Sequence, residues 1–391
     1  MASLDNLSSS FDVAVVGAGV FGAWTALRLQ HAGLRVVLLD AHGAGNSRAS
    51  SGGESRVIRM GYGADEIYTR SATESFAEWR EFIAKTARPV FHRTGVLWLA
   101  HKGSQYVLDT KNTLVRVGLK FEELSRSDLE RRYPQIDFGE IEWGLLEPDS
   151  GVLMARQLVT VVVQDAVERG VTYLQESARP PTNVENSHIR NVETQNGHRI
   201  SADKFIFACG PWLPKLFPDL LGELIQPTRQ EVFFFGVPGG DTRFAPPEMP
   251  VWIDFHDFIY AIPDLEGRGF KMAIDEHGPV FDPETGNRTI TAEGSKAIRQ
   301  HLARRLPSLA QAPVIETRVC QYENTSNGDF LIDRHPSFEN VWLVGGGSGH
   351  GFKHGPMVGK YVTALVTGDK VEPEPRFSLA TKRSVRQRSV Y

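Results

Sequence analysis

Residues 12–40 read DVAVVGAGVFGAWTALRLQHAGLRVVLLD, and this stretch decides the fold. The apolar run at 12–16 is typical of a buried parallel strand. Residues 20–32 carry apolar side chains at helical spacing and end before Gly33, which favours a helix. A second apolar run follows at 36–39. This order predicts a β-α-β unit of the Rossmann type.

Three glycines mark the passage from the first strand into the helix, in the pattern G-x-G-x-x-G. Gly17 permits a tight turn, Gly19 lets a pyrophosphate approach the backbone, and Gly22 lets the helix pack closely on the strand. The helix N-terminus adds the positive end of its dipole. Asp40 ends the second strand, where a carboxylate binds ribose hydroxyls. The pattern indicates NAD or FAD, and the acid at this position disfavours a 2′-phosphate.

Composition excludes several classes of protein. Lys and Arg total 43 against 47 Asp and Glu, so we expect neither a nucleic-acid nor a membrane partner, since both need a cationic face. Two cysteines, Cys209 and Cys320, are too few for a disulfide scaffold or a multi-cysteine zinc site, and we expect no metal. No apolar run approaches the roughly 18–20 residues of a membrane span, and the first ten residues lack a secretory signal. We therefore expect a reduced, cytoplasmic protein whose basic end, 381–391, is a solvated tail.

Similar strand patterns recur far along the chain. Runs at 204–208 and 341–344 resemble the first strand, whereas 94–100 and 231–237 are rich in β-branched and aromatic residues. We therefore expect an α/β (α+β two-domain) chain in which a Rossmann-like nucleotide-binding domain is interleaved with a mixed-sheet substrate domain. The expected boundaries are 1–85, 146–225 and 318–391 for the first domain, and 86–145 and 226–317 for the second.

A polar, Ser/Gly-rich stretch at 43–54 leads into Arg56 and Arg59. We expect it to be a long flexible loop. Two arginines three residues apart are a plausible means of covering a flavin and meeting an anion, and the alternative for each is a surface ion pair.

Five motifs then occur in order over nearly the whole chain: GAGVFG with Asp40, SGGESRVIRMGYG at 51–63, DSGVL at 149–153, VCQYENTSNGDFLIDRHP at 319–336 and GGSGHGFKHGP at 346–356. Together they resemble the monomeric sarcosine oxidase family, which includes N-methyltryptophan, pipecolate and fructosyl amino acid oxidases. This match is much more specific than the glycine pattern. It implies that the dinucleotide is FAD, so that the nucleotide domain is an FAD-binding domain, and that the chain is a flavoprotein amine oxidase.

The resemblance also implies how the cofactor is held. Cys320 matches the cysteine linked through sulfur to the 8α-methyl of FAD, whereas Cys209 is expected to be a small packed residue. The glycine-rich turn after 341–344 lets the backbone approach a flat cofactor, and a helix is expected to begin near Pro356. The cofactor-binding residues expected are Gly17, Gly19, Gly22, Asp40, Ser51, Arg56, Cys320, Gly347, Gly349, His350, Gly351 and Lys353.

The catalytic residues follow from the same resemblance. Arg59 and Lys353 would pair with a substrate carboxylate. Lys271 would lie over the flavin face where oxygen reacts, because a fixed cation stabilises superoxide. Tyr322 and Tyr260 match tyrosines of the substrate pocket.

Two departures from the family pattern concern the substrate. Asp275 stands where sarcosine oxidases carry histidine, and an acid there resembles the fructosyl amino acid oxidases, in which it serves sugar hydroxyls. The segment Ser50 to Arg56 reads SSGGESR against SHHGDTR in sarcosine oxidases, so it lacks histidine.

The expected activity is FAD-dependent oxidation of a secondary amine on a small carboxylate-bearing substrate, an N-methyl or imino amino acid. Oxygen would be the acceptor, and hydrogen peroxide a product beside the imine. A fructosyl amino acid oxidase, a flavin dehydrogenase with another acceptor, an NAD-dependent dehydrogenase and a catalytically silent flavin-binding module remain alternatives. The expected partners are the amine and oxygen, and the chain would be a monomer or small homo-oligomer.

Overall fold

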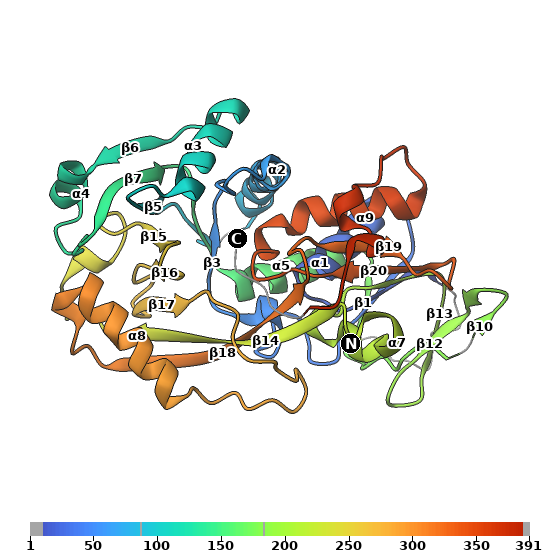
Figure 1. Ribbon diagram of the computed structural model, residues 1–391. Coiled ribbons are helices and arrows are strands. Elements are labelled where there is room, and N and C mark those ends of the chain that lie inside the picture. The colour runs from blue at the N-terminus through green and yellow to red at the C-terminus, as the bar shows by residue number, and fades with distance from the viewer. Residues whose placement is uncertain (1–10, 87, 183, 386–391) are drawn as a thin grey trace.

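The computed structural model describes residues 11–86, 88–182 and 184–385. Two large sheets lie side by side, one around β1 and β20 and the other around β5, β7 and β15 to β17 (Figure 1). The long strands β14 (Ile225–Phe235) and β18 (Val314–Thr325) run from the second sheet toward the first. The expected α/β architecture of a Rossmann-like unit and a mixed sheet is therefore confirmed.

The first sheet has the strand order β19-β20-β13-β1-β2-β9, and β12 pairs with β13. β1 pairs in parallel with both β2 and β13, and α1 connects β1 to β2, so the predicted β-α-β unit is confirmed. Its elements are β1 (Phe11–Val16), α1 (Val20–His31), β2 (Val36–Leu39), α5 (Ala155–Glu168), β9 (Thr172–Leu174), β12 (Asn191–Glu193), β13 (Arg199–Phe207), β19 (Leu331–Arg334), β20 (Val341–Gly345) and α9 (Gly355–Thr367).

The second sheet has the order β18-β14-β17-β16-β15-β5-β7-β6. It is mixed, because β5 and β15 pair in parallel whereas β14 pairs antiparallel with both β17 and β18. Besides β14 and β18 it comprises β5 (Val96–His101), α3 (Gln105–Val117), β6 (Glu122–Ser125), α4 (Arg126–Arg132), β7 (Ile141–Glu147), β15 (Val251–Asp254), β16 (Ile259–Ile262), β17 (Phe270–Ile274) and α8 (Ala292–Arg305).

A smaller sheet and several short elements complete the chain. The third sheet joins β3, β8 and β4, and α2 lies against α9. The remaining bounds are β3 (Arg56–Ile58), α2 (Glu66–Ala84), β4 (Phe91–His92), β8 (Gly151–Leu153), β10 (Val184–Glu185), β11 (His188–Ile189), α6 (Leu213–Leu216) and α7 (Pro218–Leu221), with 3-10 turns η2 (Ser50–Gly52), η3 (Gly210–Trp212), η4 (Thr242–Phe244), η5 (Pro307–Leu309), η6 (Phe352–His354), η7 (Pro375–Phe377) and η8 (Leu379–Thr381).

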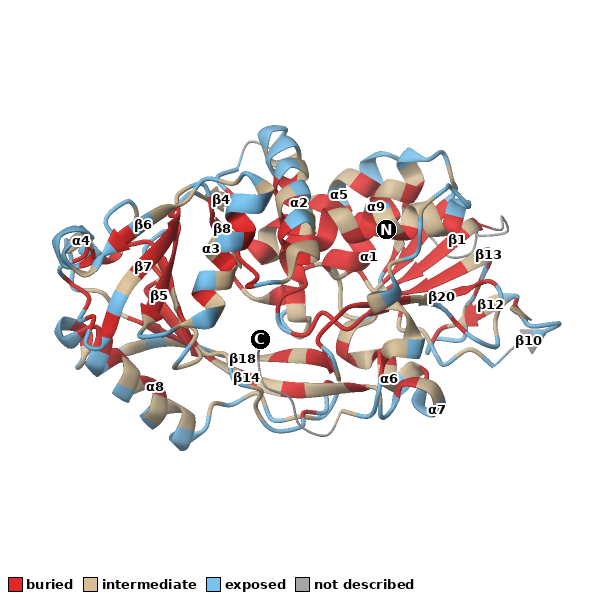
Figure 2. Cartoon of the chain, turned by 45° about the horizontal axis from the view of Figure 1, so that its top comes forward, coloured by how far each residue is buried: buried red, intermediate tan, exposed pale blue. Residues whose placement is uncertain are grey.

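One large apolar core lies where the helices α1, α2 and α9 meet beside the first sheet, and Figure 2 shows α1 mostly buried while buried and more exposed residues alternate along α2 and α9. Trp24 on α1 packs edge-to-face on Trp79 of α2, with ring centroids 5.1 Å apart. A Cβ at Gly359 would come within 2.8 Å of the Trp24 backbone. The absence of a side chain there lets α9 approach α1 closely, which places the turn before α9 against the first sheet.

One expectation about the chain is wrong. The stretch 43–54 is not an open flexible loop, because it folds around the Asn46 side chain and contains η2. Asn46 donates to the Gly43 carbonyl at 2.7 Å and accepts from the amides of Arg48 and Ala49 at 3.0 and 2.9 Å. The side-chain amide of Asn46 thus closes the turn, and Ser51 within the segment is buried.

Other expectations concern the ends of elements. The strand expected at 231–237 is the second half of β14, which begins at Ile225. Two proposed domain boundaries fall within β14 and β18, and the domain boundaries stay a prediction.

The first ten residues and the last six, on which the leader and part of the tail expectation fall, lie outside the described residues. Among the helices in the described ranges, none combines the length and apolar composition needed to cross a membrane.

Candidate active site

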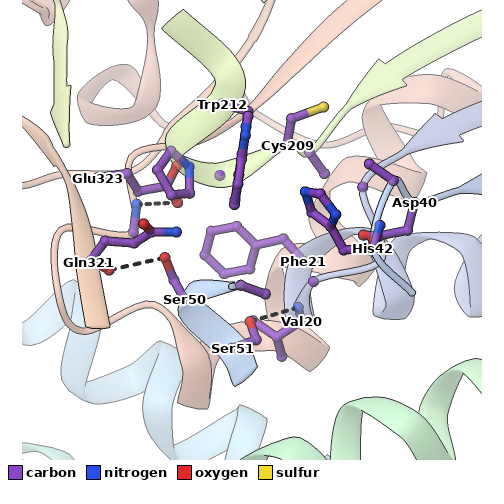
Figure 3. Close-up of a pocket in the computed structure, with 18 of the residues that line it drawn as sticks. Val20, Phe21, Asp40, His42, Ser50, Ser51, Cys209, Trp212, Gln321 and Glu323 are labelled. Carbon is purple, nitrogen blue, oxygen red and sulfur yellow. Dashed lines mark hydrogen bonds between the residues drawn. The ribbon is translucent and has the colours of Figure 1, made fainter. Parts of the chain in front are cut away.

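A cavity of about 470 Å³ lies at the carboxyl ends of β1 and β2. Figure 3 shows Asp40 and His42 on one side of it, Gln321 and Glu323 on the other, and the Phe21 ring between them. Ligands of open parallel sheets bind outside the carboxyl ends of the strands. We call this space the larger cavity.

The turn between β1 and α1 forms one wall of the larger cavity. Gly17 has φ +102°, and a Cβ there would lie 2.3 Å from the Ala208 oxygen, so only glycine fits. Gly19, the N-cap of α1, lines the cavity, and the Val20 amide in the first turn donates to Ser51 Oγ at 3.1 Å. Gly22 does not line the cavity and instead lies against Gly17, where a Cβ would be 1.8 Å from its oxygen.

Asp40 lies at the end of β2 with its carboxylate beside this turn. It accepts from the Ala18 amide at 2.8 Å and from the His42 amide at 2.9 Å. Burial raises the pKa of Asp40, and these backbone hydrogen bonds oppose the rise. The carboxylate therefore fixes the turn as well as lining the cavity.

Glu323 on β18 also lines the larger cavity, and its two carboxylate oxygens differ in their contacts. Oε1 accepts from the Gly347 amide at 3.1 Å, whereas Oε2 is buried with no hydrogen-bond partner among the described residues. Burial raises the pKa of Glu323 to about 7. A neutral carboxyl can donate a hydrogen bond, so this side chain is suited to a polar ligand of the larger cavity.

A second cavity of about 100 Å³ adjoins the first, and we call it the smaller cavity. Cys320, Tyr322, Arg56 and Gly349 line both. Side chains alternate along a strand, so Cys320 and Tyr322 share one face of β18 while Glu323 faces the larger cavity only. β18 therefore forms the common wall.

Two basic side chains meet at the Tyr62 ring in this region. The Arg59 guanidinium carbon lies 4.5 Å from the ring centroid and Lys353 Nζ lies 5.2 Å from it. Nζ also donates to the Tyr62 hydroxyl at 2.9 Å and to the His350 carbonyl at 3.0 Å. Burial, reinforced by the charge of Arg59, lowers the pKa of Lys353 well below its ordinary value. An anion bound beside Arg59 and Lys353 would restore the charge of Lys353.

Lys271 lies on another wall of the smaller cavity and is 3% exposed. Its Nζ donates to the Ser55 carbonyl at 3.0 Å and to Ser55 Oγ at 3.2 Å. Burial, with help from the charge of Arg56, lowers the pKa of Lys271 to about 7. The ammonium is thus held in place and poised to titrate near neutral pH.

Asp275 and the two tyrosines complete the smaller cavity. The Tyr322 hydroxyl donates to Asp275 Oδ1 at 2.6 Å. Burial raises the pKa of Asp275, while the Tyr322 hydrogen bond and the charges of Arg59 and Lys353 oppose the rise. Tyr260 lines the same cavity, 5.9 Å from Lys271 Nζ to its ring centroid.

The two cysteines differ in their surroundings. Arg56 Nη2 donates to Cys320 Sγ at 3.3 Å, and Cys320 lines both cavities. Cys209 Sγ donates to the Val16 carbonyl at 3.3 Å, and burial raises the pKa of its thiol. Only Cys320 has a cation beside its sulfur among the described residues.

The expected site residues thus fall into three groups that line a cavity, and one residue lines none. The larger cavity alone is lined by Gly17, Gly19, Asp40, Ser51, Gly347 and Gly351. The smaller cavity alone is lined by Arg59, Tyr260, Lys271, Asp275, His350 and Lys353. Cys320, Tyr322, Arg56 and Gly349 line both, and Gly22 lines neither.

Several polar residues of the site were not expected from the sequence. Glu147 accepts from the Met60 and Gly61 amides at 2.7 and 3.1 Å and thereby holds the chain beside Arg59. Ser55 anchors Lys271, and Glu323 faces the larger cavity. The sequence offers one signal for these residues, their place in or beside the family motifs. Glu147 precedes DSGVL, and Ser55 lies within SGGESR.

His101, Asp254, His256 and Asp257 form a cluster, and none of the four lines either cavity. Arg305 pairs with Asp254 at 2.6 Å, and Arg304 pairs with Asp257. Both carboxylates are already charge-compensated, so we assign no metal to the cluster.

The residues of the larger cavity fit FAD. Gly17 and Gly19 give a close approach to backbone at a helix N-terminus, Asp40 lies at the end of β2, and the unpartnered Glu323 oxygen offers a polar contact. Cys320 and the 347–351 turn would hold the flavin end, next to the smaller cavity.

The chain belongs to the family of FAD-dependent oxidoreductases, whose model matches residues 12–365. It is 31% identical over 378 residues to monomeric sarcosine oxidase of Bacillus sp. (strain B-0618), covering 94% of each chain. It is also 31% identical over 386 residues to peroxisomal sarcosine oxidase of Homo sapiens, covering 95% of each. L-proline dehydrogenase from P. horikoshii has the same fold, with a TM-score of 0.83 at 20% identity over 95% of this chain and 98% of that one. Family and relatives together make the protein an FAD-dependent amine oxidoreductase.

Proposed function

We propose that this protein oxidises a secondary amine on a small carboxylate-bearing substrate, an N-methyl or imino amino acid, with oxygen as acceptor. The observation that carries the proposal is the pair of cations, Arg59 and Lys353, at a small cavity that shares Cys320 with the larger one. The names of the sarcosine oxidase relatives support the same substrate class.

The two cations suit one carboxylate. The Arg59 guanidinium presents parallel N–H donors that match the two carboxylate oxygens. Lys353 adds a point charge from the turn before α9. Two cations from separate segments fix the direction of the substrate. Orientation of this kind lowers a reaction barrier by up to about 7–11 kcal/mol.

The chemistry at the amine needs few protein groups. Bound FAD supplies the acceptor for the two electrons of the C–H bond beside nitrogen. The product imine is hydrolysed by water to an aldehyde or ketone and an amine. We name no general base on the protein for the oxidation itself, which requires the amine unprotonated.

Two further roles complete the proposal. Lys271, fixed by Ser55, would supply the cation for the reaction with oxygen, which yields hydrogen peroxide. Cys320 would link the flavin covalently. Its exposure to both cavities and the hydrogen bond from Arg56 support this role.

Anaerobic bleaching of the flavin absorbance by a panel of amines tests the proposal. The panel is sarcosine, N-methyltryptophan, pipecolate, proline and fructosyl-glycine. We expect rapid bleaching by at least one of sarcosine, N-methyltryptophan, pipecolate and proline, and slower bleaching at subsaturating amine in Arg59→Met. Flavin that no member bleaches would contradict the proposed substrate class.

Asp275 favours a second candidate, a fructosyl amino acid oxidase. Its carboxylate accepts from Tyr322 at the wall of the smaller cavity, where it could also accept from sugar hydroxyls. Bleaching by fructosyl-glycine alone would support this candidate over the first.

A further inference from the structure

Lys353 begins a chain of hydrogen bonds that leaves the smaller cavity. Its Nζ lies 2.9 Å from the Tyr62 hydroxyl, and this hydroxyl lies 2.7 Å from His354 Nε2. On the other side of the same imidazole, Nδ1 lies 2.9 Å from Ser71 Oγ on α2. Every step from the cavity to α2 is therefore within hydrogen-bond distance.

The hydrogen-bonded residues are buried except at the end that lies on α2. Lys353, Tyr62 and His354 are 5%, 2% and 0% exposed, whereas Ser71 is only partly buried. A buried polar chain is costly unless its members satisfy one another. These residues do so in a line that runs from the cavity to a partly exposed residue of α2.

The neighbouring His350 determines how protons can be arranged in this line. Its Nε2 lies 3.0 Å from the Gly328 carbonyl, which only accepts, so this nitrogen carries the proton. Its Nδ1, 3.3 Å from the Tyr62 hydroxyl, is then an acceptor. Tyr62 therefore faces two imidazole nitrogens, one on His350 and one on His354.

Two proton arrangements are compatible with these distances. In one, Tyr62 donates to His350 while His354 Nε2–H donates to Tyr62 and Ser71 donates to Nδ1. In the other, Tyr62 donates to His354 Nε2, and Nδ1–H donates to Ser71. From the first arrangement, the Tyr62 hydroxyl rotates from His350 to the neutral amine of Lys353. Its proton then passes to Nζ, the His354 Nε2 proton passes to Tyr62 and the Ser71 proton passes to Nδ1, while Ser71 takes a proton from water, which gives the second arrangement.

We propose that Tyr62, His354 and Ser71 relay protons between Lys353 and water beside α2. The inference rests on the proposed function, in which Lys353 binds a substrate carboxylate. A carboxylate that binds there requires the charged form of the lysine. When the ligand brings no ammonium proton, one O–H bond of water or hydronium breaks at the outer end and one N–H bond forms on Lys353, with no electron transferred.

The lowered pKa of Lys353 makes the proton uptake that accompanies carboxylate binding measurable. Burial and the charge of Arg59 lower the pKa of Lys353, whereas Asp275 and Glu147 oppose the shift. Burial, together with the charge of Lys353, also lowers the pKa of His354, so the imidazole is neutral and able to exchange tautomers. The titratable and charged groups around Lys353 are Tyr62, Arg59, Glu147, Asp275, His350 and His354.

The test is proton uptake on binding of propionate, a carboxylate without an amine. The flavin-loaded protein is mixed with propionate in weakly buffered indicator dye near pH 8, and binding is followed separately by the flavin spectrum. We expect wild type to take up close to one proton per bound propionate, as fast as propionate binds. In Ser71→Ala and His354→Phe, uptake should lag behind binding by tenfold or more.

Matched variants separate a relay from a structural role. Ser75→Ala removes another buried hydroxyl of α2, one with no hydrogen-bond partner in the described chain, and should leave uptake as in wild type. Ser71→Thr keeps the hydroxyl and should restore fast uptake. Uptake equally fast in all variants, or binding without uptake in wild type, would overturn the relay.

The readout does not depend on amine oxidation. If propionate draws its proton through the relay and no amine of the panel reduces the flavin, the proposed function fails and the relay stands. If an amine reduces the flavin but uptake is insensitive to Ser71 and His354, the relay alone is wrong.

Discussion

Arg56 donates a hydrogen bond from Nη2 to the sulfur of Cys320, across 3.3 Å. The same guanidinium donates to the carbonyls of Ser50 and Ser55, at 2.7 and 2.8 Å. Backbone groups thus fix the cation beside the one cysteine that lines both cavities. A fixed cation stabilises the negative charge of a sulfur that reacts as a nucleophile.

Cys320→Ala should therefore yield protein whose flavin is released by acid. In wild type, the flavin should stay with the acid-precipitated protein, since a thioether survives denaturation. Cys209→Ala serves as the control, and its flavin should also remain attached. Equal release from wild type and Cys320→Ala would show that the link is absent.

Lys271→Met should slow the reaction with oxygen far more than the reduction of the flavin. Loss of one preorganised donor that stabilises developing negative charge typically costs about 10²–10³ in rate, and we expect a loss of this order here. Stopped-flow kinetics measure the two half-reactions separately, anaerobic reduction by amine and reoxidation by oxygen. A similar loss in both would remove Lys271 from the oxygen role.

The reaction with oxygen should also depend on pH. The pKa of Lys271 is lowered to about 7 by burial, so its ammonium is present below this pH and lost as the pH rises through it. We expect the second-order rate constant for oxygen to fall with an apparent pKa near 7, or above it where negative charge on the cofactor favours the ammonium. A rate constant that is flat from pH 6 to 10 in wild type would contradict this role.

Glu147 should matter for stability because its carboxylate accepts four hydrogen bonds. The donors are the Met60 and Gly61 amides, Trp98 Nε1 and Ser150 Oγ, at 2.7 to 3.1 Å. Glu147→Ala leaves buried donors unsatisfied, which should lower the free energy of unfolding by about 3–5 kcal/mol. Glu142→Ala, at an exposed position of β7, should change it by less than about 0.5 kcal/mol in the same denaturant titration.

Local patterns in the sequence predict part of this architecture well. The β-α-β unit follows from its glycines and apolar runs, because each of its contacts is close in sequence. The alternation of β18 brings Cys320 and Tyr322 to one face, so two neighbours within one motif share the smaller cavity.

Contacts between distant segments could not be predicted in this way. Tyr62 meets His354 across 292 positions, and Lys271 meets Ser55 across 216. No local pattern encodes either pair, since the packing of α2 against α9 and of β17 against the 43–55 segment creates them.

The compact fold of 43–54 around Asn46 was missed for a related reason. One side-chain amide closes that turn, in a run whose composition is typical of a flexible loop.

The central claim is that a carboxylate positions the amine for oxidation. Anaerobic stopped-flow reduction of the flavin by sarcosine and by dimethylamine tests it most directly, because the two differ only in the carboxylate. We predict that sarcosine reduces the flavin at least a hundredfold faster than dimethylamine at equal subsaturating concentration, given charge-assisted hydrogen bonds worth about 1.5–3 kcal/mol each. If pipecolate or N-methyltryptophan is the better substrate, its decarboxylated analogue replaces dimethylamine in the comparison. Equal rates with and without the carboxylate would contradict the claim.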